Sequence, residues 1–383
     1  MTDLRTVSVA GVTLALPDAC VGRLQSDPDQ AGAVSAFLAT SPDTTTYHQP
    51  AWMAFARSIR RHADVLLVER DGAPQFAVPV HPEGRTLAIG VSGIVLPPGA
   101  REAAHKRAVR TLADLVAANP RYGWEGLQSA QAPAYDDPER TALVAWQLEQ
   151  AGLAGAPLWS RLLCWGPDDP VPDEDDDPLD HLGGYDAKLR NQIRQAGRHG
   201  LQINHALPQD PGQAESVYRP FTDLHRESWA RTGLRPHSLR YWTDLSAAVV
   251  AGGSRDLVVT ARSPEGDLVA AVVCHLRGAR ALYWAGASRP TGLESRANQL
   301  CLHTAVTRAR ALGVTTFELG RFSAAEPSDK EQSVTRYKAQ FGGSLLRLTT
   351  LATPTTRGQW LAHQAYRAQR RAQVLRGRDF LYV

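Results

Sequence analysis

Lysine is scarce in this sequence. The 383 residues include 38 arginines but only four lysines, Lys106, Lys188, Lys330 and Lys338. Where a position needs only a positive charge, such a chain would be expected to use arginine. An ammonium is a compact charge whose pKa can move, whereas a guanidinium is a rigid fork that stays charged. The lysine in the stretch TRYKAQFGG, residues 335–343, therefore needs a specific explanation.

Long apolar runs and paired cysteines are also absent. The longest apolar run, residues 268–274, is far shorter than the roughly 20 residues that span a bilayer. The first 20 residues read as two β segments around Gly11 without a clear cleavage site, so we expect no secretory signal. Four scattered cysteines without a CxxC pair are typical of reduced core residues, which favours a cytoplasmic location.

Several catalytic motifs are missing too. The sequence has no HExxH, no nucleophile elbow and no P-loop, and its twelve histidines do not follow a metal-ligand spacing. We therefore predict no metal site and no bound cofactor. Any chemistry would then depend on the side chains of this chain and on its co-substrates.

One segment concentrates negative charge. Residues 166–181, GPDDPVPDEDDDPLDH, contain eight acidic residues and neither lysine nor arginine. The segment is rich in proline and has no periodicity, so we interpret it as a solvated linker between domains. Without it the net charge would change from +3 to +11. A basic body favours a polyanionic partner, although free use of arginine would also explain the charge.

The order of predicted elements is the same in both halves of the chain. Each half has two helices, three strands, a helix, a strand, a helix and a strand, and matching elements lie about 190 residues apart. The first-half elements are expected at 28–39, 50–60, 64–70, 75–80, 85–91, 102–118, 124–130, 138–151 and 158–164. The second-half elements are expected at 217–231, 238–250, 256–262, 268–277, 279–287, 297–312, 314–320, 331–340 and 344–350. Two copies of one domain are the simplest explanation.

The predicted fold is therefore α+β, with two tandem domains that are each a mixed twisted sheet flanked by helices. The first domain is expected over 1–165 and the second over 182–343, with the acidic linker at 166–181 between them. After the second copy, residues 356–378 are expected to form a further, very basic helix.

The tandem order of elements is the layout of the GNAT acyltransferase fold. Four blocks narrow the resemblance: KLRNQIRQAGRHGLQI, RPHSLRYWTDL, NQLCLHTAVTRARALGVTTFELG and RYKAQFGG. Their order and spacing resemble those of the Fem family of aminoacyl transferases, of FemX and FemAB type. The first half resembles the family more loosely, through YHQPAWMAF and LLVERDGAPQFAVPV. In that family the tail of the chain returns to the first domain, so 344–383 is expected there.

The resemblance implies formation of an amide bond. In the Fem family an amine acceptor attacks the ester carbonyl of an aminoacyl-tRNA without a covalent enzyme intermediate. Lys338 matches the lysine of the family's Phe-Lys-x-x-Phe-Gly-Gly block, and Tyr337 replaces its first Phe, which makes these two residues the candidate catalytic residues. The family's lysine is thought to stabilise charge at the reacting ester.

Elementary chemistry suits this role for Lys338. Attack on an ester builds an oxyanion, and a preorganised donor aimed at it can lower the barrier by about 2.7 to 4 kcal/mol. Gly342 and Gly343 would let the backbone approach a ligand closely or turn sharply. The competing interpretation is a surface lysine after a helix, with glycines that serve only the turn.

Four other residues are candidates for substrate binding. Trp52 belongs to the first-half block. His237 stands in place of the arginine of the family's Arg-x-x-x-Tyr block, and Tyr241 matches its tyrosine. Tyr283 ends a predicted central strand, where aromatic residues are more often part of the core. Family members that modify peptidoglycan precursors have a lysine about four positions after the tryptophan, where this chain has Ala56. We therefore expect the acceptor to be a small amine or peptide of a biosynthetic pathway, such as an antibiotic intermediate.

Six arginines are candidates for contact with the phosphates of a tRNA. Three of them lie in 188–203, where they recur every four residues opposite an apolar side. Like charges at this spacing lower the stability of the helix by a few tenths of a kcal/mol per pair, a cost that phosphate binding would offset. Solvated basic helix faces are also common. The six residues are Arg190, Arg194 and Arg198, and in the C-terminal segment Arg367, Arg370 and Arg371.

Three other functions stay open. An acyl-CoA acyltransferase of the same fold would cradle a pyrophosphate at the loop RPTGLESRAN, but Glu294 stands where a small residue is expected, and a carboxylate repels pyrophosphate. A peptidoglycan-bridge transferase and a non-catalytic GNAT-like scaffold are the others. The sequence does not identify the amino acid, the tRNA, the acceptor or the oligomeric state.

Overall fold

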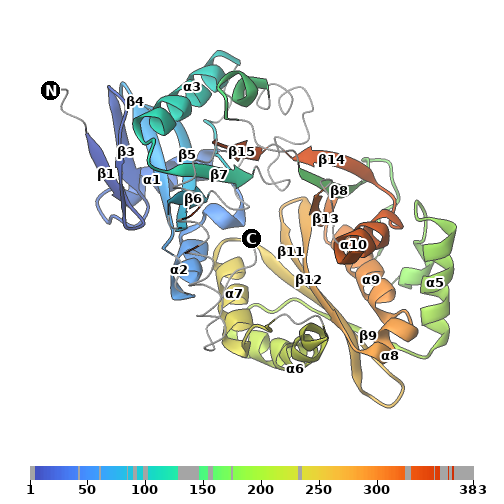
Figure 1. The fold of residues 1–383 in the computed structure, drawn as a ribbon. Coiled ribbons are helices and arrows are strands. Elements are labelled where there is room, and N and C mark those ends of the chain that lie inside the picture. The colour runs from blue at the N-terminus through green and yellow to red at the C-terminus, as the bar shows by residue number, and fades with distance from the viewer. Residues whose placement is uncertain are drawn as a thin grey trace. The chain divides into compact units, whose positions relative to one another are not determined.

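The chain forms two compact units, Met1–Leu158 with Leu348–Val383, and Trp159–Arg347 (Figure 1). The structure is a computed structural model. It describes residues 5–41, 44–59, 62–83, 85–88, 93–97, 102–127, 146–153, 158–173, 176–231, 235–323, 329–348, 350–353, 361 and 365. In this part of the chain, no helix is long and apolar enough to cross a membrane.

The first unit begins with the β hairpin expected around Gly11. Strands β1 (Thr6–Val9) and β2 (Val12–Ala15) pair antiparallel. Ala10 and Gly11 between them both have positive φ, 49° and 84°, which is the geometry of a two-residue turn that matches the twist of the strands.

The main sheet of the first unit has six strands in the order β15-β7-β6-β5-β4-β3. Its core contains Leu66, Phe76, Val78 and Trp124, all buried. The strands are β3 (Cys20–Leu24), β4 (Asp64–Arg70), β5 (Ala73–Glu83), β6 (Thr86–Ala88), β7 (Gly123–Leu127) and β15 (Thr350–Ala352), and the helices are α1 (Ala31–Thr40), α2 (Pro50–Ser58) and α3 (Glu102–Ala118). Most of the helix expected at 138–151 lies outside the described residues.

The second unit has a seven-stranded sheet in the order β14-β8-β13-β12-β11-β10-β9. Its strands are β8 (Leu158–Cys164), β9 (Gln202–Ala206), β10 (Arg255–Arg262), β11 (Leu268–Arg277), β12 (Arg280–Ser288), β13 (Thr316–Ser323) and β14 (Ser344–Leu348). Its helices are α5 (Ala187–Arg198), α6 (Pro211–Ala230), α7 (Leu239–Ala251), α8 (Pro290–Glu294), α9 (Ala297–Ala311) and α10 (Asp329–Ala339). The sequence predicted most of them, but not β9, and it placed α8 in a loop.

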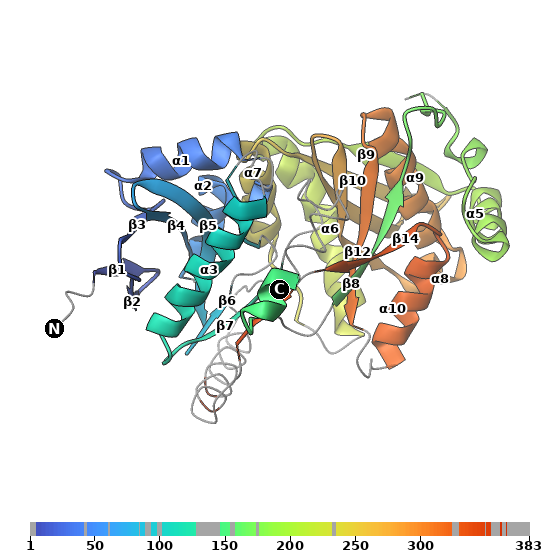
Figure 2. The same cartoon turned by 90° about the horizontal axis from the view of Figure 1, so that it is seen from above.

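Helices cover both faces of this sheet (Figure 2). Helix α9 packs on β10 and β11, α5 packs on α9, and α10 contacts β13. Helices α6 and α7 cover the opposite face over β10, β11 and β12. Along β10 the side chains alternate between the faces: Leu257 lies in the core cluster under α9, whereas Asp256 accepts a hydrogen bond from Tyr218 of α6.

The two sheets share one topology, which confirms the predicted tandem α+β fold. In each, four consecutive strands pair antiparallel and the next pairs in parallel, β6 with β7 in the first unit and β12 with β13 in the second. In each sheet the run of four antiparallel strands begins at an edge strand, β3 or β9. The internal repeat is therefore present in the strand order as well as in the sequence of elements.

The end of the first copy differs from the prediction. Strand β8, expected to complete the first domain, lies between β13 and β14 in the sheet of the second unit. The corresponding place beside β7 is taken by β15, which follows the second copy. The units thus divide after Leu158 and after Arg347 instead of at 165 and 343. Periodicity predicts a strand but not the sheet that it joins.

The acidic segment also differs from a linker between domains. It lies within the second unit, between β8 and α5, and a short 3-10 helix, Pro178–Asp180, packs on α5 and α9. The Nε2 atom of His303 lies 2.6 Å from the carbonyl oxygen of Pro178, and Leu179 packs against Gly197. Leu179 supplies apolar contact within an otherwise acidic stretch, which explains why this part of the segment is bound to the body of the unit.

Candidate functional site around Lys338

The centre of the second sheet contains a point where two parallel strands stop pairing. β12 and β13 pair over Arg280–Leu282 and Thr316–Glu318. Both strands continue, to Ser288 and Ser323, yet among the described residues no pair follows Leu282 and Glu318. We call this point, with Tyr283–Gly286 on β12 and Leu319–Gly320 on β13, the fork. Its backbone groups are potential partners for a ligand.

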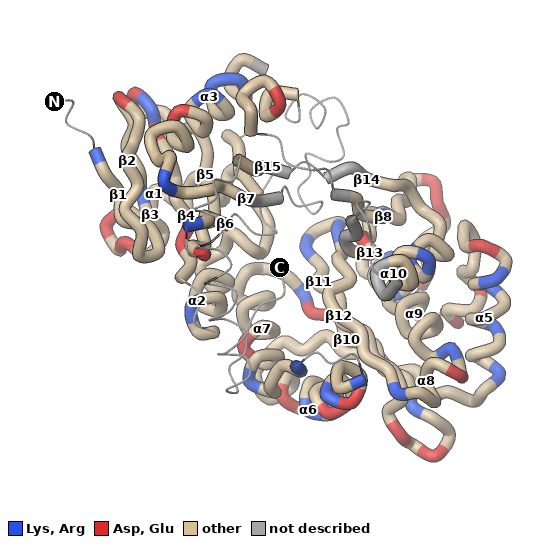
Figure 3. Tube along the Cα trace, in the orientation of Figure 1, with Lys and Arg blue, Asp and Glu red and all other residues tan. Residues whose placement is uncertain are grey.

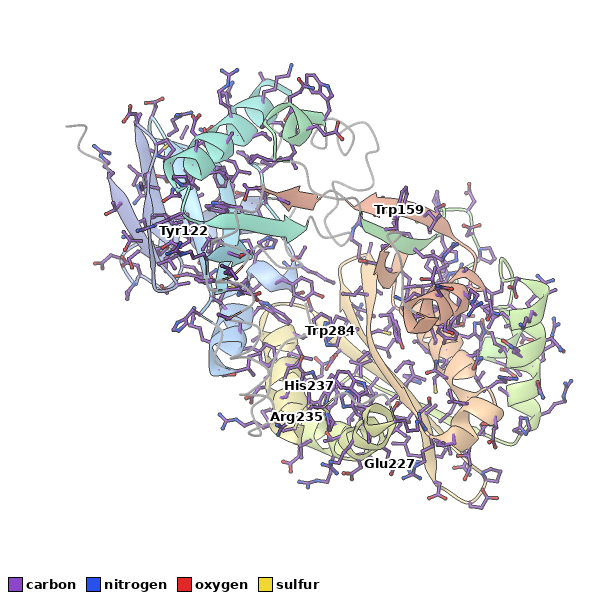
Figure 4. All side chains as sticks on the ribbon, viewed as in Figure 1. Tyr122, Trp159, Glu227, Arg235, His237 and Trp284 are labelled. Atoms are coloured by element: carbon purple, nitrogen blue, oxygen red, sulfur yellow. The ribbon has the colours of Figure 1, made fainter. Side chains whose placement is uncertain are left out.

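A β-bulge changes the direction of β12 at the fork. The register with β11 pairs Cys274 with Tyr283 and Val273 with Ala285, so Trp284 is the extra residue. Residues 283–286 are only half-buried, whereas the rest of β12 is buried. Tyr283 packs partly against the core under α9, and Trp284 stacks on His275 at 4.8 Å between ring centroids (Figure 4). The two neighbouring aromatic rings therefore lie on opposite faces of the sheet, as the alternation along a strand requires.

Lys338 lies at this fork and is buried. It belongs to the last turn of α10, and only 7% of its surface is exposed. Its Nζ atom is 3.1 Å from the point where a Cβ on Gly320 would stand, and the backbone oxygen of Tyr283 is 3.7 Å from the same point. The negative end of the helix dipole favours a cation at this place. The alternative of a surface lysine is therefore wrong, whereas a catalytic role stays a prediction.

Gly320 is a site residue that the sequence did not reveal. Its φ is +84°, in the left-handed region that side chains rarely adopt, and a Cβ would press against the ammonium of Lys338. The sequence offered one signal, a single glycine at the end of an apolar strand, and this signal is shared by many ordinary strand ends.

Tyr337 connects α10 to α9. Its hydroxyl oxygen accepts a hydrogen bond from Nδ2 of Asn298 at 3.0 Å, and its ring contacts Phe341 edge to face. Burial raises the pKa of Tyr337 well above its usual value, so the phenol stays neutral. These contacts hold the helix that carries Lys338, and a catalytic role for Tyr337 stays a prediction.

The double glycine makes the turn that follows Lys338. Gly342 and Gly343 both have a φ of +73°, and Arg161 donates a hydrogen bond to the carbonyl oxygen of Gly342 at 2.8 Å. A Cβ on Gly342 would lie 2.5 Å from the backbone oxygen of Gly184, and one on Gly343 would collide with the backbone oxygen of Leu162. Of the two functions that the sequence allowed, the structure therefore supports the sharp turn.

His237 and Tyr241, expected to bind substrate, lie in the interior. The two rings stack at 3.7 Å, and their exposed fractions are 5% and 2%. They belong to a cluster of rings on α6, α7 and the segment between them, which also includes Tyr218, Phe221, His225, Trp229 and Trp242. In this structure the pair is part of the core because the surrounding rings enclose it.

Buried histidines make the stability of this unit sensitive to acid. Burial lowers the pKa of His225 and His275 to about 3 and that of His303 to about 4. Below pH 6.5 the unfolded chain therefore binds three protons that the folded chain does not, and Asp256, whose pKa burial raises to about 6, offsets one of them. We expect the free energy of unfolding to be highest above pH 6.5 and to fall on acidification by about 2.7 kcal/mol per pH unit.

Urea unfolding at several pH values between 7.5 and 5 measures this dependence. His225→Phe is the matched variant, because both ring nitrogens of His225 lack a hydrogen-bond partner among the described residues. It should reduce the slope by about 1.4 kcal/mol per pH unit. An unfolding free energy that does not change over this range would contradict the prediction.

Trp52 lies in the core of the first unit. Its exposed fraction is 3%, and its ring contacts those of Tyr47 and Phe55, at 4.7 and 5.4 Å between centroids. The amphipathic pattern of α2 explains this, since Met53 and Ala56 are buried on the same side. Trp52 is thus a core residue of this unit, and its contact with substrate stays a prediction.

Helix α5 has the predicted amphipathic form. Leu189, Ile193 and Ala196 are buried, while Arg194 and Arg198 are exposed. Figure 3 shows basic positions in blue along α5. Arg190 is half-buried and donates a hydrogen bond to the carbonyl oxygen of Tyr185. The other candidate arginines, Arg367, Arg370 and Arg371, lie outside the described residues.

The loop that would hold the pyrophosphate of CoA contains the short helix α8. The N–H groups of Leu293 and Ser295 make ordinary backbone hydrogen bonds of this helix, to the carbonyl oxygens of Arg289 and Thr291. The guanidinium of Arg289 forms two hydrogen bonds with Glu227, at 2.9 and 3.0 Å. A Cβ on Gly292 would collide with a backbone oxygen of β11, so this glycine is needed for packing.

Comparison with known proteins agrees with this architecture. A family model described as an acetyltransferase (GNAT) domain matches residues 185–339, which include the fork and Lys338. The crystal structure of FemX is similar over 87% of this chain and 97% of its own, with 13% identity and a TM-score of 0.61. L-PGS from Bacillus licheniformis is similar over 92% of this chain and 98% of its own, with 14% identity and a TM-score of 0.53.

A conserved protein of unknown function from Bacteroides thetaiotaomicron has the same fold, over 84% of this chain and 96% of its own, with 11% identity and a TM-score of 0.51. No curated protein matches the chain in sequence. At these identities the structural likeness concerns the fold. Together with the family model, it identifies the second unit as a GNAT domain of the acyltransferase type.

Proposed function

We propose that this protein is a tRNA-dependent aminoacyltransferase. It would form an amide bond between the aminoacyl group of an aminoacyl-tRNA and an amine acceptor. The proposal combines the GNAT domain at 185–339, the FemX-like fold over most of the chain, and the four sequence blocks that resemble the Fem family.

The placement of Lys338 is the observation that carries the proposal. In a chain with four lysines, one is buried where the central parallel strands stop pairing. A buried ammonium costs desolvation energy, so an idle lysine would not be expected there. As the amine attacks the ester, negative charge develops on the carbonyl oxygen, and a preorganised cation stabilises it without reorganisation. The hydrogen bond of Tyr337 to Asn298 would keep the helix of Lys338 in place.

Two carboxylates near α8 support a donor other than acyl-CoA. Glu227 neutralises the charge of Arg289, and Glu294 stands where a small residue is expected, so both disfavour a bound pyrophosphate. The exposed arginines of α5, Arg194 and Arg198, provide the positive charge that a tRNA backbone requires.

Transfer from acetyl-CoA is the second candidate, because the matching family model is described as an acetyltransferase domain. For the acceptor, a small amine or a peptide of a biosynthetic pathway remains our choice. The cell-wall precursor is the less favoured alternative, since Ala56 stands in place of a lysine and the His237–Tyr241 pair is buried.

One assay separates the two donors. Purified protein is incubated with a panel of primary amines and either charged tRNA or acetyl-CoA, and amide products are detected by mass spectrometry. We expect product from charged tRNA that disappears after RNase treatment. Product that forms only from acetyl-CoA would reject aminoacyl-tRNA as the donor and support the second candidate.

A further inference from the structure

A row of polar residues crosses the face of the second sheet that α6 and α7 partly cover. The strand registers align Asp256 on β10 with His275 on β11, His275 with Leu282 on β12, and Leu282 with Glu318 on β13. Residues paired in this way lie side by side on one face of the sheet. The row thus contains two buried carboxylates, with His275 and Leu282 between them.

The two carboxylates have different surroundings. Asp256 is fully buried, and it accepts a hydrogen bond from the hydroxyl of Tyr218 at 2.5 Å and another from Ser246. It is therefore enclosed between the sheet and helices α6 and α7. Glu318 is 5% exposed and accepts a hydrogen bond from the hydroxyl of Ser160 on β8 at 2.8 Å.

Glu318 is the carboxylate at the fork. It is the last residue of β13 that pairs with β12, and Gly320, which borders the ammonium of Lys338, follows it by two positions, about 6.6 Å along the strand. A carboxylate and an ammonium thus flank the point where the half-buried segment 283–286 begins. Burying a carboxylate is costly, and such groups concentrate at functional sites.

We propose that Glu318 is the general base that removes a proton from the acceptor amine, while Lys338 stabilises the oxyanion. The inference rests on the proposed function, because it concerns the same site and the same amide bond. It assigns proton removal to the carboxylate and stabilisation of the oxyanion to the ammonium at the fork.

The proton and electron balance of the step is complete with these groups. The acceptor enters as an ammonium, and the Glu318 carboxylate takes one proton from it. The free nitrogen attacks the carbonyl carbon, a C–N bond forms, and the C=O electron pair moves to the oxygen beside Lys338. When the C–O bond to the ribose breaks, the leaving oxygen takes the second proton of the nitrogen. Glu318 then returns its proton to solvent.

Neighbouring titratable groups are less suited to this task. Burial lowers the pKa of His275 to about 3, and its ring lies under Trp284, so it accepts no proton near neutral pH. Among the side chains that the structure describes on the adjacent elements, the other charged groups are Arg161 on β8, Arg280 on β12, and Arg336 and Lys338 on α10, and these four are cations. They favour an anion at Glu318.

The decisive variant is Glu318→Gln, and Asp256→Asn is its matched control in the same row. Initial rates are measured from pH 6 to 9.5 with the amine that gives most product in the panel above. For Glu318→Gln we expect a rate about a hundredfold lower at pH 7, the lower end for loss of a general base. The deficit should shrink as the pH rises, because the variant must use amine that is already deprotonated. Asp256→Asn should keep the wild-type pH profile.

Ser160→Ala provides a second test that does not remove the carboxylate. The Ser160 hydroxyl stabilises the ionised form of Glu318, so its loss should move the acidic limb of the pH–rate profile to higher pH. If Glu318→Gln does not fold, the shift of the acidic limb in Ser160→Ala tests the role of Glu318 instead. A profile unchanged in Ser160→Ala, or a Glu318→Gln deficit that is the same at every pH or below threefold at pH 7, would overturn the assignment.

A comparison of three acyl donors distinguishes failure of this inference from failure of the proposed function. Rates are compared for charged tRNA, acetyl-CoA and an aminoacyl p-nitrophenyl ester, which needs no carrier. Amide formation from acetyl-CoA or the ester alone would reject the tRNA donor. The pH profiles measured with the active donor would still test the role of Glu318 as general base. Absence of amide from all three donors would overturn both.

Discussion

Lys338→Ala will lower turnover by a factor of about 100 to 1,000 while the protein remains folded. This range is the usual effect of losing one donor to an oxyanion. The ammonium lies against Gly320 at the end of α10, so truncation removes the only lysine at the fork among the described residues. Because a buried charge contributes little net stability, the melting temperature should change by only a few degrees.

The controls for this variant come from the same chain. Lys188→Ala removes an exposed lysine on α5 and should leave turnover unchanged with a small donor. Lys338→Arg keeps the charge but replaces a compact ammonium by a planar fork beside a left-handed glycine, so it should also be strongly impaired. A Lys338→Ala variant that keeps wild-type turnover, or one that loses its fold without a separable effect on rate, would reject the catalytic role.

Gly320→Ala will reduce turnover by a factor of about 10 to 100. The new methyl group would stand 3.1 Å from Nζ of Lys338, so the ammonium must move, and displacement of a catalytic group by about 1 Å can cost a hundredfold. The same substitution forces alanine into the left-handed region, which costs roughly 1 to 2 kcal/mol of stability. Both effects are measured on one preparation, by initial rates and by thermal unfolding.

Gly313→Ala separates these two effects. Gly313 ends α9 with a φ of +88°, close to the +84° of Gly320, but a Cβ there meets nothing within 4 Å. Both variants should therefore lose similar stability, while only Gly320→Ala should lose turnover. Equal losses of rate in the two variants would mean that backbone strain, and not displacement of Lys338, explains the defect.

Local signals in the sequence predicted local structure well. Ser238, a residue type typical of helix N-caps, directly precedes α7, and its hydroxyl accepts a hydrogen bond from the N–H of Tyr241 at 3.1 Å. The stripe of Leu189, Ile193 and Ala196 is the buried face of α5. Both features depend on neighbours within four positions, which a helix brings together whatever the rest of the chain does.

The candidate site was less predictable. Lys338 stood out because lysine is rare here, but its burial depends on Gly320, 18 positions earlier, and the sequence gave no reason to connect the two. The matches of Trp52, His237 and Tyr241 to family blocks were read as substrate contacts. Their burial follows from rings on other elements, such as Tyr47 for Trp52 and Trp229 for His237. Glu318 had one visible signal, a lone acid in an apolar strand.

Strand β8 has a consequence for the way the two repeats can be separated. A fragment that starts after the first copy of the repeated sequence, at residue 166, would lack β8 and leave β13 without its neighbour. Such an open edge in the middle of a sheet invites pairing with other chains. Likewise, the first copy alone would lack β15 beside β7. Each repeat is therefore incomplete without a strand encoded outside it, so a single cut between the copies should yield fragments that aggregate.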